Sequence, residues 1–195
     1  KEDLRAIKAV GIEIESVTCD GASNIIRAVQ EVCPEAIIQR CTFHIANEIC
    51  TWLTKKPKSD AARELRQLAR CLSAVENHYQ AQMWIREFID WYNKYEEYIN
   101  EKSVDEISGR WWYTHKMLHR SCTHIKRAIP NMFNYTRYAN IPKTSNSIES
   151  FFGHLKDHLR LHRGLSNEHF KNFVKWYLYL QSNQGKIAKK NEREK

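Results

Sequence analysis

Two short apolar segments lie in the first 41 residues, and each follows an amphipathic one. Residues 2–10 have helical periodicity, whereas residues 12–20 alternate apolar and acidic positions before becoming fully apolar. The second pattern is typical of a strand that enters a core. Apolar positions at helical spacing over 22–32 predict a second helix, which Pro34 ends, and residues 36–41 predict a second strand. This order of elements indicates a parallel sheet with a crossover helix.

The pattern changes near residue 43, and from there to about residue 126 almost every segment is compatible with a helix. The predicted helices cover 43–54, 59–74, 77–99 and 109–127. The third has large apolar residues three and four positions apart, at Met83, Trp84, Phe88, Trp91, Tyr92 and Tyr95. Such a stripe is typical of the core of a helix bundle rather than of a ligand site.

The remainder of the chain is less regular. Residues 128–147 contain two prolines and several asparagines, which predict a loop or an extended segment. Two helices follow, over about 146–161 and 166–181. We expect the basic tail over 182–195 to be disordered.

Charge is distributed unevenly along the chain. Residues 1–106 carry 14 Lys/Arg and 18 Asp/Glu, whereas residues 107–195 carry 17 and 5. A basic half of this kind indicates a face that binds a polyanion, most simply nucleic acid, although a solvated basic surface gives the same pattern. No apolar run approaches the roughly 20 residues that cross a bilayer, which argues against a membrane partner. The six cysteines form no C-x-x-C pair, so we expect reduced thiols in an intracellular protein.

Two acidic residues occupy positions at which a carboxylate could have a chemical role. In "SVTCDGASN", Asp20 ends an apolar strand just before a turn of small residues. In "TSNSIESFFGHLK", Glu149 lies in the first turn of a helix that Ser145 or Asn146 caps. Both positions suit an ordinary turn or capping residue, and both also suit a metal ligand. The residues alone leave these alternatives open.

The order of several motifs along the chain bears on whether Asp20 and Glu149 are capping residues or metal ligands. The segment "CDGASNIIRAVQEVCPEAIIQRCTFHIANEI" is followed, after the long helical region, by "TSNSIESFFGHLKDHLRLHRGLSNEHF". The combination resembles the DDE transposases of the bacterial Mutator-like insertion-sequence group. In that family a strand ending in "DG" precedes a helix, a "P-E-A" and a "Q-x-C-x-x-H" segment, and the third catalytic acid begins a "T-x-N-x-I-E" helix. The resemblance covers about residues 12–180.

The resemblance implies a helix-rich α/β fold, in which a partial ribonuclease-H-like core is interrupted by an all-helical insertion. The expected divisions are the partial core with the second catalytic acid, the insertion domain, the end of the core with the third acid, and the tail. They cover 1–42, 43–135, 136–181 and 182–195. The first catalytic Asp would lie upstream of Lys1, so we expect the chain by itself to be inactive.

By the same resemblance, Asp20 and Glu149 are the second and third catalytic acids and ligands of Mg²⁺ or Mn²⁺. Hydrolysis and transesterification of DNA phosphodiesters commonly use two divalent ions about 3.5–4 Å apart. Such ions require oxygen ligands, and carboxylates from separate elements can supply them.

A cysteine and a histidine form a further candidate. Cys41 and His44 have the C-x-x-H spacing that can suit zinc. A possible second half-site is Cys122 with His115, His119 or His124. The family has a C-x-x-H pair at this place near the catalytic pocket, so we expect a packing or DNA-proximal role instead. A buried thiol beside a helix-capping histidine is the plainer alternative.

Two basic segments are candidates for DNA contact. The predicted helix that carries Glu149 also carries His154, Lys156, His158, Arg160, His162 and Arg163. We expect these residues to contact DNA phosphates, with a solvated face and a transition-metal site as alternatives. The segment "GRWWYTHKMLHR" adds Trp111, Trp112, Lys116 and Arg120, a mixture of aromatic and basic residues suited to unpaired bases. Because adjacent helical residues point about 100° apart, we expect at least one of the two tryptophans to belong to the core.

The expected function is therefore cleavage of DNA at transposon ends and transfer of the strands to target DNA. The resemblance implies a homo-oligomer acting in the bacterial cytoplasm at the nucleoid, or in the nucleus of a eukaryotic host. One alternative is a domesticated or truncated remnant that binds DNA or a partner protein without catalysis. Another is a helical interaction module with no nucleic-acid role.

Overall fold

The computed structural model describes residues 1–162 and 164–193, with side chains described up to residue 182. The chain divides into two compact units, Lys1–Ser145 and Asn146–Lys195. The boundaries predicted at residues 42, 135 and 181 remain predictions.

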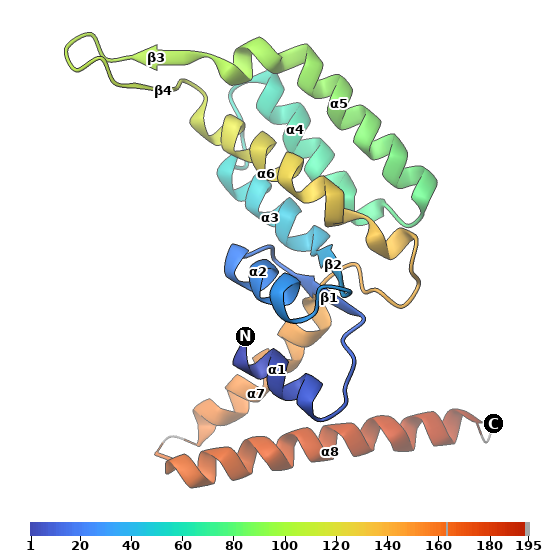
Figure 1. Ribbon diagram of the computed structural model, residues 1–195. Helices are drawn as coiled ribbons and strands as arrows, with labels where there is room; N and C mark the ends of the chain where they lie inside the picture. The colour runs from blue at the N-terminus through green and yellow to red at the C-terminus, as the bar shows by residue number, and fades with distance from the viewer. Residues whose placement is uncertain (163, 194–195) are drawn as a thin grey trace. The chain divides into compact units, whose positions relative to one another are not determined.

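The first unit begins with a parallel strand pair joined by a helix (Figure 1). Its elements are α1 (Glu2–Ala9), β1 (Ser16–Cys19), α2 (Ser23–Val32) and β2 (Ile37–Arg40). The register pairs Ser16 with Ile37 and Cys19 with Arg40, so both strands end at the same edge. A small apolar cluster fixes α2 against the strands and contains Cys19, Val29, Val32, Cys33 and Ile38. The predicted strand–helix–strand order is confirmed.

Four helices form the larger part of the first unit. They are α3 (Thr42–Trp52), α4 (Asp60–Cys71), α5 (His78–Asn100) and α6 (Lys116–Met132), with a 3₁₀ turn at Leu72–Ala74. Capping side chains begin two of them: Ser59 Oγ accepts the Ala62 N–H at 3.3 Å, and Asn77 Oδ1 accepts the Gln80 N–H at 3.0 Å.

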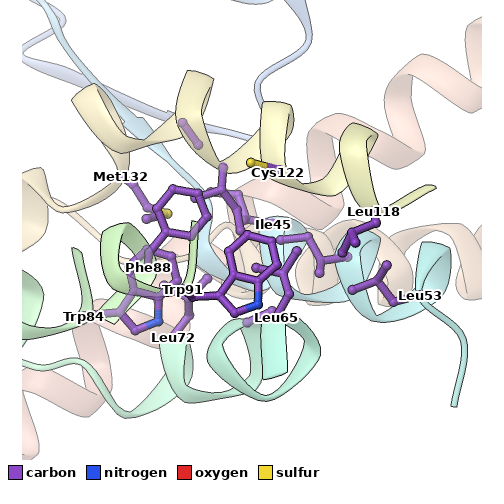
Figure 2. Close-up of a cluster of buried hydrophobic side chains, with 14 of the residues drawn as sticks. Ile45, Leu53, Leu65, Leu72, Trp84, Phe88, Trp91, Leu118, Cys122 and Met132 are labelled. Atoms are coloured by element: carbon purple, nitrogen blue, oxygen red, sulfur yellow. The ribbon is translucent and has the colours of Figure 1, made fainter. Parts of the chain in front are cut away.

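Most of the apolar stripe of α5 lies at the centre of this bundle, as its spacing predicts, with Tyr92 and Tyr95 partly buried against it. Met83 was wrongly included, because it lies outside the core and is exposed. Trp84, Phe88 and Trp91 are each at most 4% exposed. Figure 2 shows them among Ile45 of α3, Leu65 of α4 and apolar residues of α6. Trp84 Nε1 donates to the Leu68 carbonyl at 2.9 Å and Trp91 Nε1 donates to the Ala61 carbonyl at 3.1 Å. The large rings are therefore buried without leaving their N–H groups unsatisfied.

A β-hairpin stands where the sequence pattern predicts the start of a helix. β3 (Lys102–Val104) pairs antiparallel with β4 (Trp111–Tyr113), and α6 begins only at Lys116. Three consecutive aromatic residues favour a strand. Asp105 Oδ1 accepts two turn N–H groups, and Gly109 adopts a φ of +66°, which closes the loop. The prediction of a helix over 109–127 was thus wrong for its first seven residues.

The end of α6 also differs from the prediction of a loop over 128–147. The helix continues to Met132 although it contains Pro130. Ala128 and Met132 are completely buried, so packing outweighs the hydrogen bond that the proline removes. The following segment is tied to β2, because Gln39 Nε2 donates to the Met132 carbonyl at 2.7 Å and Asn134 Nδ2 donates to the Ile38 carbonyl at 2.8 Å. These bonds join the strand pair to the bundle.

The second unit consists of α7 (Asn146–Leu161) and α8 (Asn167–Arg193). A ring contact joins the two helices, with the centroids of Phe151 and Tyr177 5.5 Å apart. His162, directly after α7, contacts Phe173 of α8 with the centroids 5.3 Å apart. α8 runs to Arg193, into the segment predicted as a disordered tail, where Ala, Lys and Glu are strong helix formers. No helix in the described part of the chain is apolar over enough of its length to cross a bilayer.

Candidate active site

Asp20 lies directly after β1, at the edge where both parallel strands end. Its Oδ1 accepts the Ala22 N–H at 2.9 Å, and the residue is exposed to solvent. Ala22 is the N-cap of α2, and this cap makes no side-chain hydrogen bond. Asp20 therefore orders the turn before α2 but does not cap the first turn of that helix. The carboxylate faces solvent and is open to a further ligand.

A cleft of about 660 Å³ opens beside Asp20 within the first unit. Its walls come from the ends of β1 and β2, from α3, from Tyr113 of the hairpin and from α6. Six of its residues are basic: Arg40, Lys116, His119, Arg120, His124 and Arg127. Asp20 and Glu48 are the acids among its lining residues. The lysine and the three arginines alone outnumber the two acids, which gives the cleft a positive potential.

Aromatic rings hold the basic side chains of this cleft. The Arg120 guanidinium carbon lies 4.1 Å from the Trp52 ring centroid, and the His124 ring meets Trp52 edge-on at 5.3 Å. Tyr113 stacks on His119 with the ring centroids 3.5 Å apart. These contacts restrict long side chains that would otherwise be mobile in solvent. The cleft is therefore a partly ordered basic surface.

His124 is neutral in this cleft near pH 7. Burial, together with the charges of Arg40, Arg120 and Arg127, lowers its pKa to about 4. Its Nε2 lies 3.1 Å from a Glu48 carboxylate oxygen without forming a hydrogen bond. A proton on this ring would add a cation to a group of cations, so protonation opposes folding.

The pH dependence of stability should therefore reflect His124. Because its folded-state pKa is below the ordinary value of about 6.5, its contribution is complete above pH 6.5 and is lost as the pH falls toward 4. We expect the loss to be at most about 3 kcal/mol. Unfolding free energies at pH 7 and pH 4.5 should differ less in His124→Gln than in the wild type. An equal flattening in the control His78→Gln, whose histidine is exposed, would contradict this assignment.

The structure places the predicted DNA-binding residues of the first unit in two locations. Lys116 and Arg120 line the cleft with Asp20, which brings them together with the candidate metal ligand. Trp111 and Trp112 lie on β4 and are 54% and 49% exposed. Neighbouring strand residues point to opposite faces, and neither tryptophan joins the core. The expectation that one of them is buried was wrong, because this segment is a hairpin strand rather than a helix.

Cys41 and His44 form a pair at the start of α3. The Cys41 Sγ lies 3.2 Å from His44 Nδ1, and the Ser145 N–H and Oγ both approach the same sulfur at 3.4 Å. Burial raises the pKa of the Cys41 thiol, but the hydrogen bonds from Ser145 and His44 outweigh burial and leave that pKa below its ordinary value. Within the described residues, no group of three metal-binding side chains is found. These contacts support a packing role for Cys41 and His44.

The remaining predicted residues belong to the second unit. Glu149 lies in the first turn of α7, as predicted, and is exposed. His154, Lys156, His158 and Arg160 are exposed on the same helix. His158 also contacts the Tyr177 ring at 5.7 Å, and Arg160 pairs with Asp157 at 3.4 Å. Arg163 lies outside the described residues.

Sequence reasoning missed several cleft residues, chiefly Arg40, Trp52 and Arg127, and it named His124 only as a possible zinc ligand. The charge pattern contained part of the signal, because Lys116, Arg120 and Arg127 recur at helical spacing in the acid-free stretch between residues 107 and 148. Arg40 and Trp52 had no such signal, since they reach the cleft from elements far away in the sequence.

Comparison with known proteins gives one family. The family model described as "Transposase, Mutator family" matches residues 2–108, more than half of the chain. The chain therefore belongs to the Mutator family of transposases. Neither the curated proteins nor the solved structures gave a match. Membership of this family makes DNA the partner of the protein.

Proposed function

We propose that this chain is part of the catalytic region of a DDE transposase that cleaves DNA at transposon ends and transfers the strands to a target. Asp20 and Glu149 are the second and third acids of its active site, and the first Asp lies outside this chain. The protein acts as a homo-oligomer on paired transposon ends. The observation that carries the proposal is the position of the Asp20 carboxylate in a cleft lined by basic side chains.

The residues fit Mg²⁺ or Mn²⁺. Both are cations that favour carboxylate oxygens, and the exposed Asp20 has one oxygen bonded to a turn N–H and keeps lone pairs for a metal. Glu149, at the start of α7, supplies the same kind of ligand. When bound, two such ions activate the attacking water or 3′-hydroxyl and stabilise the leaving oxygen.

The other cleft residues position the DNA. Lys116, Arg120 and Arg127 lie on one face of α6 and neutralise backbone phosphates along the cleft. Trp111 contacts the cleft residue Tyr113 and extends this surface along the hairpin, whereas Trp112 points to the other face of the strand. Both rings are exposed and can stack on unpaired bases. The Lys102 ammonium lies 4.3 Å from the Trp111 ring centroid and holds that ring beside a positive charge. Phosphate contacts thus fix the duplex while the acids hold the metal.

Replacement of Lys116 and Arg120 by Gln tests the cleft as the DNA-binding surface. Each phosphate contact contributes about 0.9 to the slope of log K against log salt concentration, so the double variant should lose about two from that slope. Binding of a fluorescent duplex, measured by anisotropy at several salt concentrations without divalent metal, gives this number. The matched control replaces Lys55 and Lys56, which are exposed in the loop after α3.

A slope that falls equally in both double variants would show that DNA binds through charge in general and would contradict the cleft. Wild-type binding without any cleavage by the complete protein would favour the non-catalytic remnant.

A further inference from the structure

Arg40 is a buried cation without an acidic partner. It is the last residue of β2 and only 6% exposed. Its Nη2 donates to the Asp20 carbonyl oxygen at 2.9 Å, whereas its Nε is buried and has no hydrogen-bond partner. Among the residues that the structure describes, no carboxylate forms an ion pair with this guanidinium. A buried charge with an unsatisfied donor is costly unless a ligand completes it.

The backbone at Gly21 leaves room for this side chain. A Cβ built at Gly21 would lie 1.9 Å from the Arg40 Cζ, so any other residue would overlap the guanidinium. Gly21 also has a φ of +95°, which other residues rarely adopt. The "DG" pair therefore positions two groups. Asp20 carries the exposed carboxylate, and the backbone of Asp20 and Gly21 contacts the Arg40 guanidinium. Arg40 has a fixed position relative to Asp20.

Two more arginines are near Arg40 in the same cleft. Arg40, Arg120 and Arg127 all act electrostatically on His124, and each lines the cleft. Like charges this close repel one another, and Glu48 and Asp20 are too few to balance them. A bound anion would remove the repulsion and accept hydrogen bonds from the part of the Arg40 guanidinium that lines the cleft. The arrangement is thus complementary to a phosphate group.

We propose that Arg40 is a phosphate ligand, which binds a non-bridging oxygen of the DNA backbone phosphate nearest the Asp20 carboxylate. The proposal rests on the DNA-cleaving function proposed above and adds a residue to it. An arginine suits this role because its planar fork can donate to the Asp20 carbonyl and to a phosphate at once, which a lysine ammonium does less well. If Arg40 only fixed the backbone of Asp20, DNA binding would not depend on its charge.

The test measures duplex affinity and its salt dependence in the presence of EDTA for wild type, Arg40→Gln, Arg40→Lys and the control Arg86→Gln. Arg86 is exposed on α5 and does not line the cleft. We expect Arg40→Gln to bind at least about tenfold more weakly and to lose about one from the salt slope. Arg40→Lys should keep the slope with reduced affinity, and Arg86→Gln should match the wild type.

A second measurement follows binding on the wild-type chain itself. The arginine Nε–H resonances of the wild-type chain are followed by NMR during titration with inorganic phosphate, with the Arg40 resonance assigned by its absence from Arg40→Lys. A saturable shift of that resonance supports the proposal. Lack of any shift, or unchanged affinity and slope in a folded Arg40→Gln, overturns it.

The outcomes separate this proposal from the function on which it rests. If Arg40→Gln binds like the wild type while the complete protein cleaves DNA, Arg40 is not a phosphate ligand and the transposase active site stands. If Arg40→Gln loses affinity and slope but Asp20 and Glu149 prove dispensable for cleavage, the phosphate site stands and the assignment of the acids fails.

Discussion

Asp20→Asn and Glu149→Gln should each abolish metal-dependent strand cleavage by the complete protein while leaving DNA binding intact. Each change replaces a negatively charged oxygen ligand by a neutral amide of nearly the same shape. A divalent ion contributes several kcal/mol to the stabilisation of the transition state, so we expect losses of roughly 10³-fold or more. The measurement is cleavage of a labelled transposon end in Mg²⁺, together with duplex binding in EDTA.

Matched controls make the result specific. Glu168 occupies the first turn of α8 as Glu149 occupies the first turn of α7, so Glu168→Gln is the control for a helix-dipole effect. Asp90→Asn changes an exposed acid of α5 and is the control for Asp20. If the controls lose as much cleavage as the variants of the two candidate ligands, the metal-ligand assignment is contradicted. Asp20 then serves only the turn before α2, and Glu149 serves only the first turn of α7.

Truncation of Trp91 should have the largest effect on stability. The ring is 4% exposed, stacks on Phe88 at 5.8 Å and donates from Nε1 to the Ala61 carbonyl at 3.1 Å. Trp91→Ala leaves a large cavity between helices and removes the donor from a buried carbonyl, so we expect a loss of about 3–5 kcal/mol in the free energy of unfolding.

Urea denaturation followed by circular dichroism measures this loss. Trp91→Phe should cost less, because it keeps a ring in the core. Tyr79→Ala, which removes an exposed ring from the same helix, should change stability by less than about 0.5 kcal/mol. A Trp91→Ala variant as stable as Tyr79→Ala would contradict the placement of this stripe in the core.

The periodicity of apolar residues along the sequence predicted those helices and strands whose formation depends on residues close together in the chain. The α5 stripe was predicted because burial repeats every three to four residues along a helix. The strand–helix–strand start was predicted because apolar runs and Pro34 mark its boundaries. By contrast, β4 was missed because "WWYTH" has no turn signal of its own. The turn depends on Asp105 and Gly109, which stand before it.

The candidate site was predicted in part for the same reason. Asp20 and Glu149 were found through motifs, and Lys116 and Arg120 through a run of bases among aromatic residues. Arg40 could not be found, because its role follows from the parallel register that places it beside Cys19 and from the φ of Gly21. Contacts of this kind arise only when elements pair in space. They carry no local pattern in the sequence.

The most direct test of the central claim is the metal dependence of Asp20→Cys in the complete protein. A thiolate is a softer ligand than a carboxylate and favours softer cations than Mg²⁺. If Asp20 holds the catalytic metal, the variant should be inactive in Mg²⁺ and should regain strand cleavage in Mn²⁺ or Cd²⁺, whereas Asp20→Ala should stay inactive in each. Cleavage by Asp20→Cys in Mg²⁺ at the wild-type rate would contradict the account.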